Sequence, residues 1–307
     1  MRNLVFSIAV CLATVASAGQ FKVTSLQAIN VNTEQPTFHP RFMPDGETLI
    51  VCAEDFSGLG LVTVKTGDYT QLTDMPGAGY KAAISEDGKT IITRSCDFFT
   101  LKESLYIINV ATRRATLLAD GLDHINAVRV ENGEVKLNMQ GRLMRSNIAT
   151  RQINSAPASD VFVTEEDLKM VVYKNGVRTV VDPMSTSTYD AQYTWTSLSP
   201  NKKKLLFVSG NYAYTSNLDG TGLVCLGAVH APVWRGNDYV VGMEDHDDGH
   251  VFTASDIVIV RADGTNYQIL KGVSGEINMF PSVSPDGSKI AYHNLEGKIY
   301  IMTIEEE

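Results

Sequence analysis

Residues 283–292, Val-Ser-Pro-Asp-Gly-Ser-Lys-Ile-Ala-Tyr, hold the pattern that decides the fold: an Asp-Gly turn followed by a short aliphatic run. Asp-Gly between two apolar segments is the strongest short-range signal for a β-hairpin, because both positions accept the positive φ of a tight turn. Variants of this turn recur at Asp45, Asp87, Asn132, Asp167, Asn201, Asn237 and Asp286. Their spacing of 34 to 49 residues predicts seven copies of one module.

Each module contains further apolar segments of strand length. The turn is followed by a strand such as residues 49–51 or 205–208, and a third strand, such as residues 61–64 or 257–260, precedes a second turn. A weaker fourth strand closes most modules. One four-stranded antiparallel sheet cannot bury both of its faces alone. We therefore predict an all-β protein, a β-propeller in which each blade covers its neighbours.

The number of blades depends on two modules. In the fourth module, residues 184–188 show no clear last strand, so six blades are the alternative to seven. The last module, residues 279–304, supplies only three strands. We expect residues 21–26, near the N-terminus, to add the missing outer strand, which would close the ring and cover an exposed sheet edge.

The first 18 residues have the features of a cleaved signal peptide. Arg2 precedes an apolar run over residues 4–15, and Ala16-Ser-Ala18 fits the small-x-small cleavage rule. The run is about 12 residues long, whereas a membrane-spanning helix needs roughly 20. We expect export without a transmembrane segment, and residues 19–307 as a single propeller domain.

Charge and cysteine content narrow the partners and the compartment. The net charge of −9 argues against nucleic-acid binding, which depends on Lys and Arg neutralising phosphates. Cys52, Cys96 and Cys225 are expected to be small buried thiols, with a Cys52–Cys96 bridge as the alternative. The sequence has no Asn-x-Ser/Thr site for N-glycosylation, which favours the periplasm or cell surface of a bacterium.

The repeats resemble those of a known family. The Ser-Pro-Asp-Gly turn, the aliphatic strand and the strand leading to Asp-Gly-Thr are clearest in residues 283–292, 212–224 and 257–270. They are similar to TolB-type repeats, relatives of the WD repeats, over nearly the whole chain after the leader. The resemblance implies an exported propeller like those of periplasmic TolB, of prolyl-oligopeptidase-like peptidases and of a few sugar-acid lyases. Residues 19–35 leave no room for the extra N-terminal domain of TolB itself.

The entrances of the innermost strands supply the candidate binding residues. Aligned modules place aromatic and histidine side chains around the mouth of the central channel: His39, Tyr80, His124, Tyr193, Trp195, His230 and Phe280. An apolar concavity with a few polar groups is the usual form of a ligand site. Acidic residues on the same face would favour a cationic peptide or a basic protein patch. We expect an envelope protein or peptide as partner, and a monomer within a larger complex.

Two clusters suggest metal ions. An acidic segment, expected in the loop between the second and third strands of module six, contains Glu244, Asp245, Asp247, Asp248 and His250. Its oxygens could hold Ca²⁺ or another divalent cation, although it lacks the spacing of an EF-hand, and a solvated acidic loop is the alternative. His39, His124 and His230 could converge as three imidazole ligands, an arrangement that the resemblance to lyase propellers also implies.

Motifs of common enzymes are missing from the sequence. It contains no Gly-x-Ser-x-Gly, no phosphate-binding Gly-x-x-x-x-Gly-Lys and no His-Glu-x-x-His. We therefore predict a non-enzymatic binding protein that requires no cofactor. The alternative is a metal-dependent lyase or hydrolase that acts on carbohydrate through the three histidines.

Overall fold

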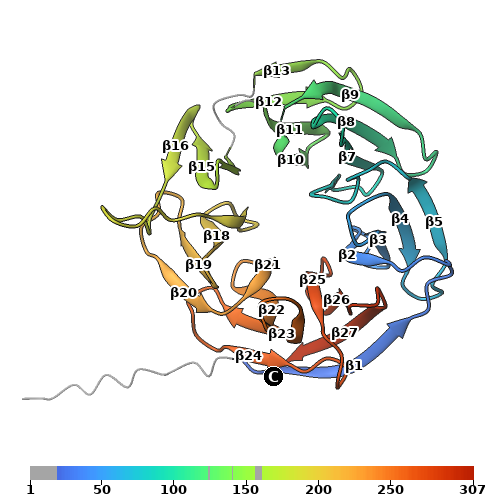
Figure 1. Cartoon of the computed structure of the whole chain (residues 1–307), viewed down its shortest axis with the longest axis vertical. Helices are drawn as coiled ribbons and strands as arrows, with labels where there is room; N and C mark the ends of the chain where they lie inside the picture. Colours follow the sequence, from blue (N-terminus) through green and yellow to red (C-terminus); the bar gives the residue numbers. More distant parts are fainter. Residues whose placement is uncertain (1–18, 124, 140, 156–160) are drawn as a thin grey trace, which may run out of the picture.

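The computed structural model describes residues 19–123, 125–139, 141–155 and 161–307. Within these ranges the regular structure is entirely β, and the strands form seven antiparallel sheets arranged as blades around a central channel (Figure 1). The protein is a seven-bladed β-propeller, which confirms the predicted fold and excludes six blades. No helix in the described part of the chain could cross a membrane. The predicted signal peptide, residues 1–18, lies outside the described residues.

The blades follow the chain order, and each is an up-and-down meander. Blade 1 contains β2 (Phe38–Phe42), β3 (Thr48–Cys52), β4 (Leu59–Thr63) and β5 (Tyr69–Thr73). Blade 2 contains β6 (Ala83–Ile84), β7 (Thr90–Asp97), β8 (Lys102–Asn109) and β9 (Ala115–Leu122). Blade 3 contains β10 (Ile125–Glu131), β11 (Glu134–Met139), β12 (Arg142–Asn147) and β13 (Ile153–Ser155). Blade 4 contains β14 (Phe162–Glu166), β15 (Lys169–Lys174) and β16 (Val177–Val181).

The second half of the ring closes on the N-terminal strand. Blade 5 contains β17 (Thr194–Leu198), β18 (Lys204–Ser209), β19 (Tyr212–Asn217) and β20 (Val224–Gly227). Blade 6 contains β21 (His230–Arg235), β22 (Tyr239–Asp247), β23 (Phe252–Arg261) and β24 (Gln268–Leu270). Blade 7 contains β25 (Met279–Val283), β26 (Lys289–His293) and β27 (Ile299–Glu306), and β1 (Phe21–Ile29) is its fourth strand.

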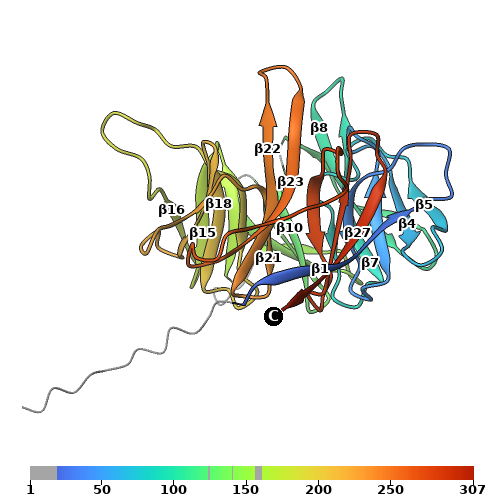
Figure 2. The same cartoon turned by 90° about the horizontal axis from the view of Figure 1, so that it is seen from below.

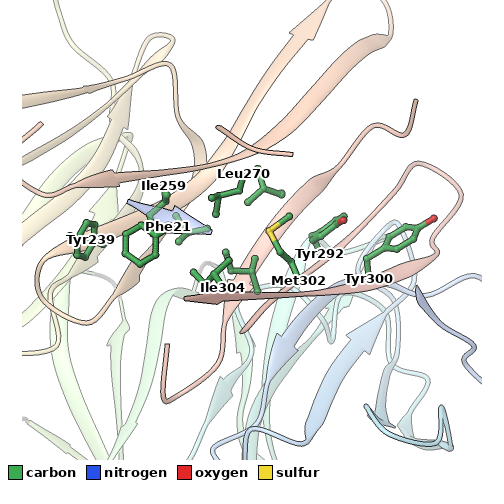
Figure 3. Packing of buried hydrophobic residues seen from close by; sticks show 11 residues of the cluster. Phe21, Tyr239, Ile259, Leu270, Tyr292, Tyr300, Met302 and Ile304 are labelled. Carbon is green, nitrogen blue, oxygen red and sulfur yellow. The ribbon is translucent and has the colours of Figure 1, made fainter. Parts of the chain in front are cut away.

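Strand β1 closes the ring as predicted. It pairs antiparallel with β27 from Phe21 opposite Glu306 to Ile29 opposite Ile299. Phe21 also packs edge-on against Tyr239 of blade 6, with ring centroids 4.9 Å apart. The wall between blades 6 and 7 is a continuous apolar cluster that includes Leu270 and Met302 (Figure 3). Burial of such side chains, at about 1.5–3 kcal/mol each, holds adjacent blades together.

The two faces of the ring differ. We call one of them the mouth face. It carries the entrances of the innermost strands and also the hairpin ends between second and third strands, such as residues 98–101 and 248–251. Two long hairpins, β7–β8 and β22–β23, stand out on this side (Figure 2). The Asp-Gly turns at Asp45, Asp87 and Asp286 lie at the opposite face.

Blade 4 departs from the prediction. It has three strands in the described structure. The Asp-Gly turns of other blades lie at the opposite face, but its first turn does not. The backbone N–H of Tyr193, at the entrance of blade 5, instead donates to the carbonyl of Leu168 in that turn at 2.8 Å. A meander of four antiparallel strands enters and leaves a blade on the same face of the ring. A meander of three strands enters on one face and leaves on the other. Blade 4 therefore runs in the reverse direction, and Asp167 and Leu168 lie on the mouth face.

Candidate functional site: the channel mouth

A repeated backbone irregularity shapes the channel mouth. The innermost strand of blades 1, 3, 5, 6 and 7 has a register shift close to its first residue. In four of them the second residue has a left-handed backbone, with φ of 53° at His39, 51° at Trp195, 44° at Ala231 and 52° at Phe280. This conformation costs about 1–2 kcal/mol for a residue other than glycine, and such strain is concentrated at functional sites. At the mouth, the left-handed residue interrupts the alternation of side chains between the two faces of the strand.

Four rings from blades 1 and 7 form an aromatic cluster, which we define as His39, Phe56, Phe280 and His293. His39 stacks on Phe56 with centroids 4.1 Å apart and meets Phe280 edge-on at 4.7 Å. His293 stacks on Phe280 at 5.5 Å. Phe56 continues the cluster edge-on to Tyr80 at 5.4 Å. The structure thus brings together three predicted residues, His39, Tyr80 and Phe280. His39 contacts Phe280 directly and is linked to Tyr80 through Phe56, which was not predicted.

Both histidines of the aromatic cluster are neutral at pH 7. Burial lowers the pKa of His293 to about 4, and it lowers the pKa of His39 as well. His293 is 3% exposed, and its Nδ1 donates to the carbonyl of Asn294 at 2.8 Å. Its Nε2 has no hydrogen-bond partner in the described structure. His39 Nε2 lies 3.2 Å from the carbonyl of Glu54, to which it donates when it carries the proton. The cluster is therefore an uncharged surface of flat rings.

Positive charge flanks the cluster at Tyr80. The guanidinium carbon of Arg94 lies 5.1 Å from the centre of the Tyr80 ring, close enough for a cation–π contact. Arg94 is buried and donates to Glu103 at 2.8 Å and to the carbonyl of Ile125 at 3.0 Å. These bonds fix Arg94, and the half-exposed Tyr80 ring lies over it.

An ion pair connects blades 2 and 4 at the mouth. Lys81 Nζ lies 2.7 Å from Glu165 Oε2. The other oxygen of Glu165 accepts the backbone N–H of Thr196 at 2.7 Å. The reversed direction of blade 4 places Glu165 at the mouth, so module alignment could not have identified it.

His230 and Asp245 were predicted in separate clusters, and the structure joins them. His230 Nδ1 and Asp245 Oδ1 are hydrogen-bonded, and both side chains are largely buried. Asp245 lies in β22, which extends beyond the mouth into the tall hairpin. The pair therefore fixes the base of this hairpin to the entrance of blade 6.

The acidic segment lies elsewhere than predicted. Most of it belongs to β22, which runs to Asp247, and only residues 248–251 form the loop. Glu244 accepts the hydroxyl of Tyr267 at 2.8 Å, while Asp248 accepts the backbone N–H groups of His250 and Val251, each at 2.9 Å. The side chains are thus directed to separate partners. In the described part of the chain, no group of three or more His, Cys, Asp or Glu residues could hold a metal.

The remaining predicted residues have different positions. Tyr193 was expected at the mouth surface, but it is 0% exposed, and its hydroxyl donates to Asp182 at 2.6 Å within the core between blades 4 and 5. Trp195, two residues later, is 45% exposed on the mouth face. His124 lies outside the described residues, so the three-histidine site stays a prediction. Cys52, Cys96 and Cys225 are free thiols, so the alternative Cys52–Cys96 bridge is not formed. Of the three, only Cys52 is buried; the expectation of a buried thiol was wrong for Cys225, which is exposed.

The tips of the two tall hairpins carry apolar side chains that were not predicted from the sequence. Phe98, Phe99 and Leu101 form the β7–β8 tip, and Phe99 is fully exposed. Val251 and Phe252 are exposed at the β22–β23 tip. The available signal was the segment Phe-Phe-Thr-Leu at residues 98–101, which has three large apolar residues at the end of a hairpin.

The fold and the mouth define a class: a seven-bladed β-propeller with an aromatic channel mouth and apolar hairpin tips on one face. No family model matches the chain, and no curated protein sequence matches it. The comparison with solved structures does find relatives of the fold. Membership of the TolB-type family stays a prediction.

Solved structures match almost the whole chain at low identity. An oligogalacturonate lyase from Vibrio parahaemolyticus has a TM-score of 0.60 and 13% identity, covering 94% of this chain and 98% of the lyase. The β-propeller domain of Cps50 (Swd1) from Myceliophteria thermophila has a TM-score of 0.61 and 12% identity, covering 92% and 99%. An oligogalacturonate lyase in complex with manganese has a TM-score of 0.60 and 12% identity, covering 94% and 98%. At this identity, the likeness shows the fold alone.

Proposed function

We propose that the protein is an exported, non-enzymatic propeller that binds a peptide segment of an envelope protein on its mouth face. The observation that carries this proposal is the aromatic cluster, which presents neutral flat rings beside the half-exposed Tyr80. Trp195, at the entrance of blade 5, adds a further exposed ring to the same face. Aromatic side chains of this kind dominate the energy of protein interfaces, because they bury large areas with few rotatable bonds.

The hairpin tips add to this surface. Phe98, Phe99 and Leu101 on one side of the mouth, and Val251 and Phe252 on another, are exposed without apolar cover. Contiguous exposed apolar groups on a soluble protein indicate an interaction site. Asp97 and Asp248 flank the two tips, so the partner segment would combine apolar and basic residues.

The test is capture of the partner. Tagged mature protein would be recovered from gently cross-linked bacterial envelopes, and the partner identified by mass spectrometry. With the purified partner, Tyr80→Ala and Trp195→Ala should each raise the Kd about 30-fold, the equivalent of about 2 kcal/mol. Leu223→Ala is the matched control, because Leu223 is similarly exposed in the β19–β20 turn at the opposite face. Wild-type affinity in both aromatic variants would refute the proposal.

The alternative function is a metal-dependent lyase or hydrolase. Its support is the position of His39 and His293, whose rings are 5.1 Å apart at the mouth, together with the two oligogalacturonate lyases among the structural neighbours. Metal analysis of the purified protein distinguishes the two functions. A bound transition metal that is lost in His39→Gln would favour the lyase, whereas a protein that holds no transition metal and takes none up would exclude it.

A further inference from the structure

Among the residues that the structure describes, no strand pairs with the outer edge of blade 4, whereas the other six blades are complete. In each of the other six blades, the third strand from the channel pairs with a fourth. Strand β16 pairs only with β15 in the described structure. Val177 and Val180 in this strand are 60% and 48% exposed. A β-branched strand with an unpaired edge is a template for pairing with another strand.

The backbone groups that face outward follow from the hairpin geometry. The turn between β15 and β16 is Asn175-Gly176, with φ of 52° and 73°, as in a type I′ turn. Such a turn makes Lys174 and Val177, which are opposite each other, a hydrogen-bonded pair. Hydrogen bonding alternates along the strand, so the N–H and C=O groups of Arg178 and Val180 point away from β15. They are the groups available to a further strand.

A groove lies beside this edge. A cavity of about 470 Å³ is lined by Val172 and Thr179 of blade 4 and by Leu218 of blade 5. Its charged lining consists of Lys174, Lys202, Lys203 and Asp219. Of the three lysines, Lys202 bonds to Glu131 at 2.8 Å. The groove is therefore positively charged in a protein whose net charge is negative.

We propose that blade 4 is completed by an extended acidic segment of a partner protein, which adds to β16 as a fourth strand. Main-chain bonds to Arg178 and Val180 would supply part of the affinity, and alternate side chains the specificity, as in other cases of strand addition. On one face of the added strand, carboxylates would lie over the groove near Lys174 and Lys203. On the other face, β-branched residues would pack beside Val180.

Charge distinguishes this occupant from a second copy of the chain. Two copies paired through β16 would place two lysine-lined grooves against each other, and like charges in proximity disfavour such pairing. The site is separate from the mouth face, so neither proposal depends on the other.

The test uses a short labelled peptide in which Glu alternates with Val or Thr, and a matched peptide with Lys in place of Glu. Binding is followed by fluorescence anisotropy. The acidic peptide should bind, and the basic one should not. Val180→Pro removes one outward N–H without touching the β15 ladder, and it should weaken binding about tenfold, whereas Val180→Thr, which keeps the N–H, should bind like wild type. Lys174→Glu with Lys203→Glu should also abolish binding.

Hydrogen exchange on the wild-type protein makes the test independent of variant folding. The amides of Arg178 and Val180 should exchange rapidly in the free protein and slow when the acidic peptide is added. Equal binding of both peptides, no slowing at these amides, or no binding of the acidic peptide would overturn the proposal. A dimer in sedimentation that Val180→Pro dissociates would assign the edge to a second copy instead.

Discussion

Blades 4 and 7 have the same shortage of strands in their own stretch of chain, but it has a different outcome in each. Each has three consecutive strands in its stretch of chain, but blade 7 gains β1 from the N-terminus, whereas blade 4 gains no fourth strand in the described structure. In blade 7 the added strand covers the sheet edge and seals the apolar wall with blade 6. In blade 4 the edge stays open beside a groove. In this ring the fourth strand is therefore present where the chain ends meet, whereas the described blade 4, within the ring, has three strands.

The largest effect on stability is expected from weakening β1, the strand that closes the ring. Phe21 is buried against Tyr239, and the guanidinium of Arg235 lies 4.6 Å from its ring centre. Phe21→Ala should lower the free energy of unfolding by about 3–5 kcal/mol, measured by urea denaturation. Leu26→Ala, in an exposed part of the same strand, is the control and should cost less than about 1 kcal/mol. Similar losses in the two variants would contradict a sealed wall.

A second experiment uses pH, because the contact of blade 7 with blade 1 buries a histidine. Burial lowers the pKa of His293 from its usual 6.5 to about 4. The unfolded chain therefore takes up this proton at higher pH than the folded protein, so stability falls as the pH decreases from 6.5 to 4. The expected loss from this group is roughly 3 kcal/mol.

Unfolding free energies measured between pH 7 and 4.5 test this expectation. His293→Gln should flatten the pH dependence, although it will also lower stability at pH 7. His250→Gln is the control, since His250 is exposed in the β22–β23 loop and should leave the slope unchanged. An unchanged slope in His293→Gln would show that the interior of blade 7 is more open to water than the structure indicates.

The smallest effect concerns how blade 4 is held without a fourth strand. Its last strand leads into residues 182–193, and the Tyr193 hydroxyl donates to Asp182 and accepts the N–H of Met184 at 3.1 Å. Tyr193→Phe should cost about 1–2 kcal/mol, because it removes both hydrogen bonds of a hydroxyl on a fully buried residue. Tyr212→Phe, at an exposed position, should change stability by less than about 0.5 kcal/mol. Thermal melting of both variants measures the difference.

The regular part of the fold was predictable from sequence. The Asp-Gly turns and aliphatic runs located the modules, and the shortage of strands in residues 279–304 led to the closing strand at Phe21. The direction of blade 4 was not predictable from the same rules. Residues 162–167 have the composition of any other module turn, and only the number of strands that follow determines the face at which the turn lies.

The mouth was predictable in part, and its errors have a physical cause. Module alignment found His39, Tyr80, Trp195 and Phe280, because it identifies equivalent positions. It misplaced Tyr193, because a left-handed residue at Trp195 interrupts the alternation that pattern rules assume. Phe56 comes from the loop between β3 and β4, and His293 is the last residue of β26. Their contacts with His39 depend on how blades 1 and 7 meet.

The pairing of β1 with β27 also determines how the ring would respond to mechanical load. Phe21 lies opposite Glu306, so both chain ends leave the sheet at the same end. Tension applied between the two termini acts along the hydrogen bonds, which are perpendicular to antiparallel strands, and loads them one after another. The ring would therefore unzip at its closure under low force, and the blades away from this seam would come under load only afterwards.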